Sequence, residues 1–224
     1  MNIVITGAGK GIGFELAKIF TANKHRTFAI SRNTESLQNL SGNLLKPFSF
    51  DLLKGDYQQL ALKIKDFLPE VDILINNAGI LINKAFRDFT DDDFDIMFRT
   101  NVNSVAKMSR MLLPDLKPGS HIVNISSIGG YQGSSKFPGL SLYSASKGAV
   151  SILSEAMAEE LKEKGVSVNA LALGAVQTEM LALAFPGYQA SLKAPEMASF
   201  IYDFAINGNK YFNGKIIPVS SSTP

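Results

Sequence analysis

The stretch Ile3-Val-Ile-Thr-Gly-Ala-Gly-Lys-Gly-Ile-Gly13 decides how the rest of the sequence is interpreted. Its first three residues form an apolar, β-branched run, which is typical of a strand buried on both faces. Glycines follow at positions 7, 9, 11 and 13, and residues 14–20 then carry apolar side chains at helical spacing. A strand, a glycine turn and a helix start form a phosphate cradle, because the glycines let the backbone approach closely and the helix N-terminus offers free N–H groups.

A glycine-rich turn that binds nothing is the alternative, since a single glycine pattern is weak evidence. The spacing of Gly7, Gly11 and Gly13 also departs from the G-x-G-x-x-G of the common dinucleotide fingerprint. The choice between the two interpretations therefore depends on the rest of the chain.

Composition limits the classes of protein that the chain can belong to. Its 224 residues, 46% hydrophobic and 19% charged, can bury one sizeable core, so we predict a single domain over residues 1–224. A net charge of +2 lacks the basic footprint of a nucleic-acid binder. The absence of cysteine excludes disulfides and thiolate metal sites. With only His25 and His121, far apart in the chain, we expect neither a metal centre nor a Ser-His-Asp triad.

The first predicted strand leaves no room for a signal peptide, and no apolar run reaches the length of a membrane span. We therefore expect a soluble, cytoplasmic protein with no membrane partner.

Predicted strands and helices alternate along the chain. Further strands are predicted at residues 26–31, 44–50, 71–75, 121–125, 166–173 and 215–219, and helices at 34–40, 55–68, 90–113, 141–164 and 195–206. This alternation predicts an α/β fold, a Rossmann-type doubly wound parallel sheet of about seven strands with helices on both faces. Ligands of such sheets bind at the carboxyl ends of the strands.

Chemistry-bearing residues follow most of these strands at that edge. After the glycine turn come Ser31-Arg32, Asp51-Leu52, Asn76-Asn-Ala-Gly79 and Ser126-Ser127. A row of polar strand ends on one edge of a sheet is harder to produce by chance than any single motif.

Tyr143-Ser-Ala-Ser-Lys147 lies at the start of the long helix predicted over residues 141–164. Four residues of helix place Tyr143 and Lys147 on one face, roughly 6 Å apart along the axis. A phenol has a pKa near 10 and is a poor acid at neutral pH. A nearby ammonium favours the phenolate and brings the group closer to the working range of a proton donor.

Together these motifs resemble those of the short-chain dehydrogenase/reductase family over nearly the whole chain. The motifs are TGxxxGIG at residues 6–13, NNAG at 76–79, a helix asparagine at Asn101, a serine at Ser127 and YxxxK at Tyr143 and Lys147. The resemblance implies an NAD(P)-dependent reaction between a carbonyl and an alcohol.

The resemblance also implies a role for each of four catalytic residues. Tyr143 donates the proton to the carbonyl oxygen, and Ser127 hydrogen-bonds that oxygen. Lys147 holds the nicotinamide ribose and lowers the pKa of the phenol, while Asn101 positions a water that leads protons out. Taken singly, Ser127 could be a turn residue, Asn101 a helix residue facing solvent and Lys147 a surface lysine; their joint presence favours catalysis.

The choice of cofactor has a separate signal. Ser31 follows the second strand, where an acidic residue would hold an unphosphorylated ribose, and Lys10 and Arg32 suit a 2′-phosphate, so we predict NADP, with NADPH preferred over NADH. Asp51 is expected to accept from the adenine amine. The predicted cofactor site comprises Gly7, Gly9, Lys10, Gly11, Ile12, Gly13, Ser31, Arg32, Asp51, Leu52, Asn77, Ala78, Gly79, Lys147, Gly174, Val176 and Thr178.

Several features depart from the family pattern. Leu173-Gly174 stands where the family has Pro-Gly, residues 134–139 lengthen the interval between Ser127 and Tyr143, and the C-terminus lacks the usual glycine pair. Thr178 remains at the position of the family's carboxamide-contacting threonine.

Residues 178–194 are predicted to form a short substrate lid over the nicotinamide. The lid is largely apolar and no arginine follows Arg110, which favours an uncharged carbonyl substrate; the alternative is that these side chains only pack the lid down.

We therefore predict an NADPH-dependent carbonyl reductase with a small-molecule substrate and no nucleic-acid partner. A non-catalytic NADP-binding sensor or scaffold is the alternative from another class, and a 3-oxoacyl thioester reductase is the alternative enzyme. The family resemblance implies a homodimer or homotetramer.

Overall fold

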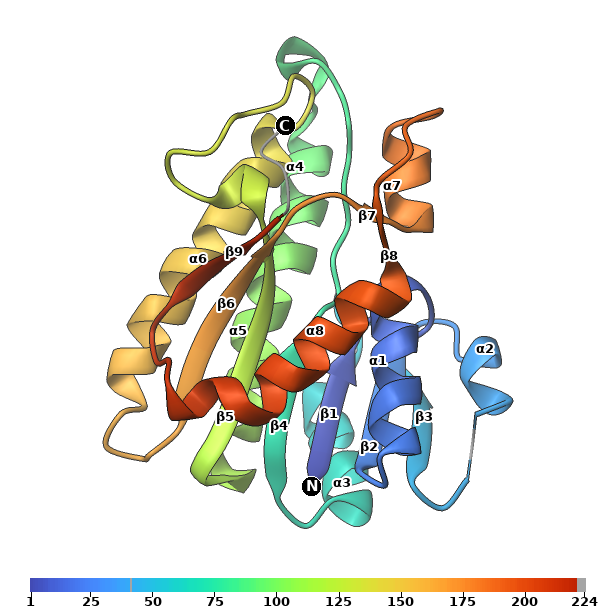
Figure 1. Ribbon diagram of the computed structural model, residues 1–224, viewed down its shortest axis with the longest axis vertical. Helices are drawn as coiled ribbons and strands as arrows, with labels where there is room; N and C mark the ends of the chain where they lie inside the picture. Colours follow the sequence, from blue (N-terminus) through green and yellow to red (C-terminus); the bar gives the residue numbers. More distant parts are fainter. Residues whose placement is uncertain (41, 221–224) are drawn as a thin grey trace.

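Seven parallel strands form one sheet in the computed structural model, which describes residues 1–40 and 42–220 (Figure 1). They are β1 (Asn2–Thr6), β2 (Arg26–Ser31), β3 (Leu45–Ser49), β4 (Val71–Asn76), β5 (Leu116–Ser127), β6 (Ser167–Leu173) and β9 (Ile216–Val219). Their order across the sheet is β3-β2-β1-β4-β5-β6-β9. The predicted doubly wound fold is confirmed. Residues 221–224, the end of the C-terminal segment that departs from the family pattern, lie outside the described residues.

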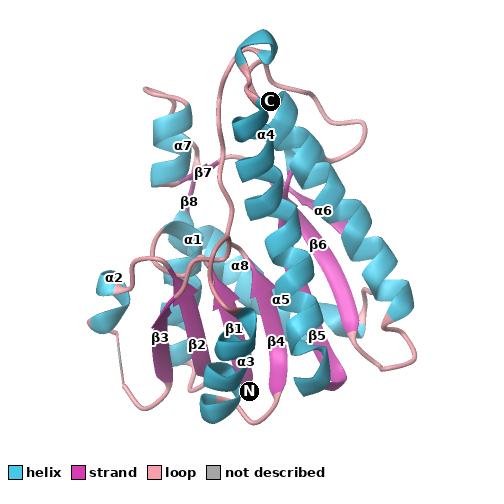
Figure 2. Cartoon of the chain, turned by 180° about the vertical axis from the view of Figure 1, so that it is seen from behind, coloured by secondary structure: helices cyan, strands magenta, loops and turns pink. Residues whose placement is uncertain are grey.

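Helices cover both faces of this sheet. One face carries α1 (Gly11–Ala22) and α8 (Ala194–Asn207), with the short α2 (Glu35–Gln38) beside them (Figure 1). The other carries α3 (Tyr57–Phe67), α4 (Asp91–Phe98), α5 (Ser104–Leu112) and α6 (Ser141–Glu160) (Figure 2). Successive residues of a strand pack into the cores on opposite faces of the sheet: Ile3 and Ile5 pack under α1 and α8, and Val4 packs on the opposite side. This alternation of buried residues explains the continuous apolar run of β1.

The strand order fixes where a ligand can bind. The chain proceeds from β1 outward through β2 and β3, then returns to place β4 against the other side of β1. The loops that leave β1 and β4 therefore diverge, and a crevice opens between them at the carboxyl edge.

Strand β5 is longer than the predicted 121–125, and three further elements differ from those predicted. The helix predicted over residues 90–113 is interrupted by a π-helical turn, Arg99–Asn103, between α4 and α5, although Thr90 caps it as expected with Asp93 in a capping box. Helix α6 ends at Glu160, because residues 161–165 form a tight turn that Gly165 closes at φ +72°.

The third difference is a two-stranded ribbon, β7 (Val176–Gln177) with β8 (Leu192–Lys193), which brackets helix α7 (Glu179–Ala184). Strands of two residues are too short to produce a recognisable period, so the sequence pattern gave no sign of them.

Within residues 1–40 and 42–220, no helix combines the length and apolar character needed to cross a bilayer. The same residues contain no cluster of three or more His, Asp or Glu side chains suited to a metal ion.

Candidate active site

A cavity of about 500 Å³ opens at the carboxyl edge of the sheet. Residues from the glycine turn, the ends of the central strands, the start of α6 and the lid all line it. From the predicted set these are Gly7, Gly9, Lys10, Gly11, Ile12, Ser31, Arg32, Asp51, Leu52, Asn77, Ala78, Gly79, Ser127, Tyr143, Lys147, Gly174, Val176 and Thr178. Gly13 and Asn101 lie outside this lining.

The glycine turn has the shape of a cradle that side chains would fill. Gly7 and Gly11 adopt φ values of +68° and +56°, which favour glycine. A Cβ on Gly9 would lie 2.4 Å from Ser31 Oγ, and one on Gly13 would lie 2.2 Å from the Gly7 carbonyl oxygen. The turn therefore fits the pyrophosphate of a dinucleotide. Gly13 contributes by letting α1 pack against the turn, and not by lining the cavity.

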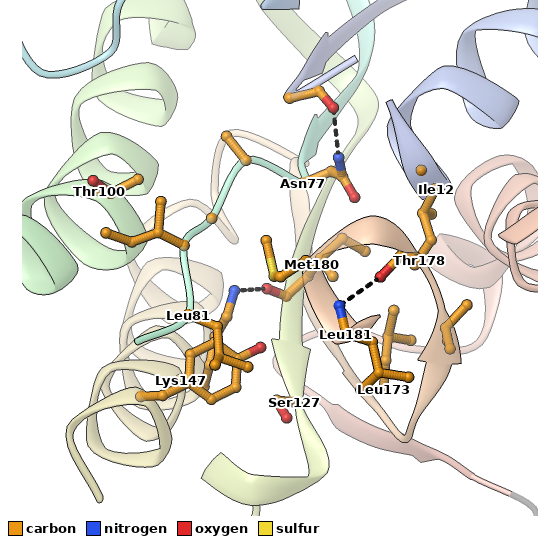
Figure 3. A pocket seen from close by; sticks show the side chains of 18 of the residues that line it. Ile12, Asn77, Leu81, Thr100, Ser127, Lys147, Leu173, Thr178, Met180 and Leu181 are labelled. Carbon is orange, nitrogen blue, oxygen red and sulfur yellow. Dashed lines mark hydrogen bonds between the residues drawn. The ribbon is translucent and has the colours of Figure 1, made fainter. Parts of the chain in front are cut away.

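Asn77 and Ala78 hold the turn against β4. The Thr6 hydroxyl oxygen accepts from the backbone N–H groups of Asn77 and Ala78, both at 3.1 Å. The Asn77 side-chain amide donates to the carbonyls of Thr6 and Gly7 at 3.1 and 3.2 Å (Figure 3). The NNAG motif thus fixes the turn across the β1–β4 crevice, and its last three residues, Asn77 to Gly79, also line the cavity.

Ser127 and Lys147 lie on the other side of this crevice (Figure 3), and Tyr143 lines the same cavity. Ser127 ends β5, and its Oγ accepts from the N–H of Gly129 at 3.2 Å and hydrogen-bonds with the Tyr143 phenol. Tyr143 and Lys147 lie one turn apart on α6, with Lys147 Nζ 5.9 Å from the centre of the tyrosine ring. Both side chains therefore lie on one face of α6.

Lys147 is enclosed by the protein. Its side chain is 4% exposed, and Nζ donates to the carbonyl of Ile125 at 2.8 Å (Figure 3). Burial lowers the pKa of Lys147 to about 8, because the charged ammonium loses its hydration. Lys147 can therefore hold or release a proton close to physiological pH.

The pKa of Tyr143 moves in the direction opposite to the one that the family resemblance implies. Burial raises it to about 12, and a hydrogen bond with Ser127 opposes this rise only in part. Lys147 does not offset this rise, in keeping with the direction of its Nζ toward Ile125. The phenol thus carries its proton at neutral pH, as a proton donor must.

Asn101 lies in the π-helical turn and is fully buried. Its Oδ1 accepts from the N–H of Ile80 at 2.8 Å, and its Nδ2 donates to the Ile80 carbonyl and to Ser146 Oγ. The side chain therefore clamps the loop after β4 onto α6, beside Gly79 and Lys147. Its predicted part in holding a water stays a prediction.

Three other predicted cofactor residues line the cavity, and two of them accept hydrogen bonds from nearby backbone N–H groups. Asp51 Oδ1 accepts from the N–H of Leu53 at 2.8 Å, and the Thr178 hydroxyl caps α7 by accepting from Leu181 at 3.3 Å. Arg32 is exposed, and its guanidinium makes no ion pair with the described part of the chain. Their contacts with the adenine, the carboxamide and a phosphate stay predictions.

Sequence reasoning missed most of the cavity's apolar wall. Ile80, Leu81, Ile96, Thr100, Phe137 and Leu140 also line the cavity. Phe137 belongs to the lengthened segment 134–139, where an aromatic residue among Gly, Ser and Pro was the available signal. Ile96 and Thr100 lie one helical turn apart, so a helix-face argument could have found them.

The lid and two loops meet over this wall. Asn83, in the loop after β4, donates through Nδ2 to the Ala184 carbonyl at the end of α7, at 2.8 Å. Gly139 has φ +82°, and a Cβ there would fall 1.9 Å from Asn83 Oδ1. The predicted lid thus contains α7, and Asn83 fastens it to the substrate side of the cavity.

Comparisons with known proteins agree with this geometry. The family model described as short chain dehydrogenase matches residues 1–189, so the chain belongs to the short-chain dehydrogenase/reductase family and is an NAD(P)-dependent oxidoreductase of that family. Carbonyl reductase [NADPH] 2 of Sus scrofa is 34% identical over 186 residues, 80% of this chain and 73% of the relative. An uncharacterised oxidoreductase of Staphylococcus aureus (strain USA300) is 28% identical over 96% of this chain and 95% of its own length.

Solved structures share the fold. A 3-ketoacyl-(acyl-carrier-protein) reductase from Brucella melitensis, complexed with NADH, superposes with a TM-score of 0.87 at 25% identity, covering 97% of this chain and 96% of that one. A short-chain dehydrogenase/reductase from the same organism reaches a TM-score of 0.90 at 24% identity, over 100% of this chain and 96% of the other.

Proposed function

We propose that this oxidoreductase uses NADPH to reduce an uncharged, largely apolar ketone or aldehyde to the alcohol. The observation that carries the proposal is the convergence of Ser127, Tyr143 and Lys147 on a cavity whose far wall is apolar. Membership of the family supports the reaction class, and the pig carbonyl reductase supports the substrate type.

The nicotinamide supplies the hydride that reduces the carbonyl carbon. Tyr143 gives its phenolic proton to the carbonyl oxygen, and a pKa of about 12 keeps that proton in place until the oxygen gains negative charge. Ser127 donates a hydrogen bond from its hydroxyl to the same oxygen. Lys147, whose Nζ lies 5.9 Å from the centre of the tyrosine ring, would hold the nicotinamide ribose.

The preference for NADPH is supported by the charges at the adenosine end of the cavity. Lys10 and Arg32 line it, and Ser31 stands where a carboxylate would repel a 2′-phosphate. Exchanging these features tests the preference: Ser31→Asp combined with Arg32→Ala is expected to reverse or erase it, as measured by titration with NADPH and NADH.

The substrate class is supported by the segments that wall the far end. The loop after β4, α4, the loop before α6 and the lid contribute Ile80, Leu81, Ile96, Thr100, Phe137, Leu140, Met180, Leu181, Phe185 and Tyr188. These residues are uncharged and include no guanidinium that could clamp a phosphate or a dicarboxylate. Apolar walls with two polar anchors suit an aliphatic or aromatic carbonyl compound.

A β-ketoacyl thioester is a second candidate substrate, favoured by the likeness to the Brucella reductase and by an apolar cavity that would accept an acyl chain.

A sensor or scaffold without catalysis has no use for the assembled Ser127, Tyr143 and Lys147. Assembly into a homodimer or homotetramer stays a prediction.

Consumption of NADPH tests the proposal directly. The rate is measured spectroscopically with a neutral aryl ketone, a β-ketoacyl thioester and a sugar phosphate, using Tyr143→Phe as the blank. The highest kcat/KM is expected for the aryl ketone. A preference for the sugar phosphate would overturn the substrate class, and turnover by the blank would overturn the mechanism.

A further inference from the structure

An ion pair joins the glycine turn to the predicted lid. Lys10 Nζ lies 2.8 Å from Glu179 Oε2. Lys10 is the residue immediately before α1, and Glu179 is the first residue of α7. Both residues line the same cavity. The ammonium that suits a cofactor phosphate is therefore already held by a carboxylate of the same cavity.

This pairing creates a competition within the proposed function. Of the two cations at the adenosine end, Arg32 has no ion-pair partner in the part of the chain that the structure describes, whereas Lys10 is paired. A 2′-phosphate that recruits Lys10 must displace Glu179 or approach its negative charge. We propose that Glu179 competes with the 2′-phosphate for Lys10 and thereby limits the preference of this protein for NADPH over NADH.

The exposure of the pair determines the size of the effect. The Lys10 and Glu179 side chains are 61% and 67% exposed, so solvent screens their attraction. Exposed ion pairs of this kind correspond to roughly two- to fivefold in an equilibrium constant. NADH has no 2′-phosphate and therefore does not compete with Glu179 for Lys10. Removing the Glu179 charge should therefore strengthen NADPH binding by that factor and leave NADH binding unchanged.

Direct binding titrations of the purified full chain test this inference without a substrate. Nicotinamide fluorescence gives the Kd for NADPH and for NADH with the wild type, Glu179→Gln, Lys10→Gln and the double variant. The expected result is a tighter Kd for NADPH, with NADH unchanged, in Glu179→Gln. In the Lys10→Gln background the same substitution should change neither Kd, because the contested cation is absent.

Glu159→Gln is the matched control. Glu159 forms another exposed ion pair, with Lys162 at 3.6 Å, and does not line the cavity. It removes the same net charge from the protein, so any effect that it shares with Glu179→Gln is a general charge effect. Thermal melting of each variant without cofactor confirms that the fold is intact.

Three results would overturn the competition. They are an equal change for both cofactors, no change in Glu179→Gln, and a gain that persists without Lys10, which would indicate simple repulsion by Glu179. A protein that binds neither cofactor refutes the proposed function itself and the inference that rests on it. A protein that binds NADPH but ignores the Glu179 charge refutes the inference alone.

Discussion

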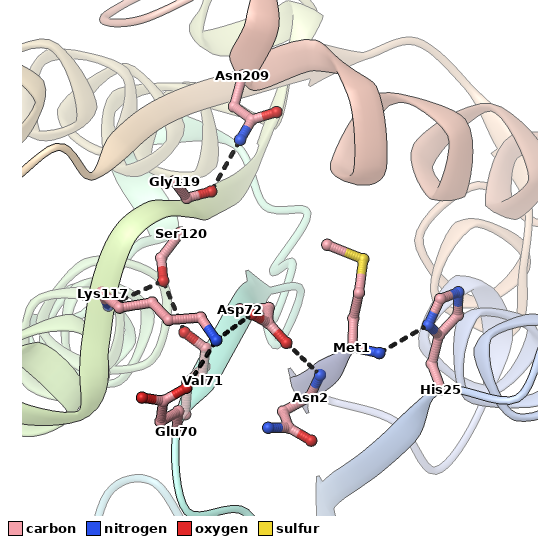
Figure 4. A network of polar contacts seen from close by, with 10 residues as sticks. All are labelled: Met1, Asn2, His25, Glu70, Val71, Asp72, Lys117, Gly119, Ser120 and Asn209. Atoms are coloured by element: carbon pink, nitrogen blue, oxygen red, sulfur yellow. Dashed lines mark hydrogen bonds and ion pairs between the residues drawn. The ribbon is translucent and has the colours of Figure 1, made fainter.

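The two edges of the sheet use their polar residues in opposite ways. At the amino edge they satisfy one another (Figure 4): Asp72 accepts from the N–H of Asn2 at 2.7 Å, and Lys117 Nζ lies 2.6 Å from Glu70 and 3.1 Å from Asp72. Ser120 Oγ donates to the Val71 carbonyl at 2.7 Å. These contacts tie the starts of β1, β4 and β5 together.

At the carboxyl edge the end of β5 and the start of α6 carry groups that line a cavity. Ser127 hydrogen-bonds with Tyr143, the pKa of the Tyr143 phenol is about 12, and Lys147 is buried with a pKa of about 8. Burying such groups costs free energy that a purely structural edge would recover through pairing. The difference teaches that one edge holds the sheet together, while the other keeps hydrogen-bonding capacity for a ligand.

Among substitutions that test this difference between the two edges, removal of the Tyr143 hydroxyl should have the largest effect. Tyr143→Phe is expected to lower kcat by roughly 10²–10⁴, equivalent to about 3–5 kcal/mol, because the proton donor is lost. The unfolding free energy and the Kd for NADPH should stay close to the wild type. Steady-state kinetics, urea unfolding and fluorescence titration measure the three quantities. If the unfolding free energy fell by as much as the activation free energy for kcat rose, the main role of Tyr143 would be to stabilise the fold.

A buried histidine tests the sheet away from the active site. His121, on β5, is 1% exposed; its Nδ1 contacts the Ala205 carbonyl and its Nε2 contacts the Asn169 amide nitrogen, each at 3.0 Å. Asn169 is fixed in this orientation, since its Nδ2 donates to Phe212 and its Oδ1 accepts from Lys215. A second ring proton on Nε2 would face a donor. Burial lowers the pKa of His121 from 6.5 to about 4.

The sign of the stability change follows from this lowered pKa. The unfolded state takes up a proton near pH 6.5, while the folded state resists it until about pH 4. As the pH decreases from 6.5 to about 4, the unfolding free energy should therefore fall by about 1.4 kcal/mol per pH unit, about 3 kcal/mol in all. Above pH 6.5 it should not depend on the titration of His121. Urea unfolding of the wild type and His121→Gln over pH 4–7.5 isolates this term. Parallel pH profiles of the two proteins would contradict it.

Phe137, in the lengthened segment 134–139, should affect the choice of substrate but not the binding of the cofactor. Phe137 lines the cavity from a loop that Lys136 and Ser134 stabilise through bonds to the Tyr131 carbonyl. Phe137→Ala is expected to lower kcat/KM for an aryl ketone about tenfold, because apolar contact area in the cavity is lost. The Kd for NADPH should not change. Phe86→Ala removes an exposed phenylalanine that does not line the cavity and serves as the control; an equal loss there would remove Phe137 from the substrate site.

The sequence predicted the central architecture because its signals are local. β-branched runs, glycines and helical spacing gave the seven strands of the sheet, and β2 matched at both ends. The sequence could place Ser127, Tyr143 and Lys147 at one edge of the sheet because strand ends and helix turns fix their positions. The apolar wall could not be predicted, since Ile80, Phe137 and the lid meet only through tertiary contacts.

Two electrostatic features also lay outside the reach of the sequence. The opposing effect of burial on the pKa of Tyr143 depends on the folded surroundings of the phenol, which residue spacing does not reveal. The Lys10–Glu179 pair joins residues 169 positions apart, and no pattern links them.

The amino edge should show the smallest effect and sharpen the contrast most. Asp72→Asn keeps the side-chain shape and an oxygen for the N–H of Asn2, but removes the charge that faces Lys117, which retains Glu70. Since the contacts are partly exposed, the unfolding free energy should fall by about 1 kcal/mol or less, which lowers Tm by roughly 2–4 °C. Neither kcat nor the Kd for NADPH should move, because the edge lies at the opposite end of the strands from the cavity. Calorimetry and steady-state kinetics on one preparation measure both. A change in kcat with unchanged Tm would show that the two edges are coupled, and the division between a structural edge and a functional edge would then be wrong.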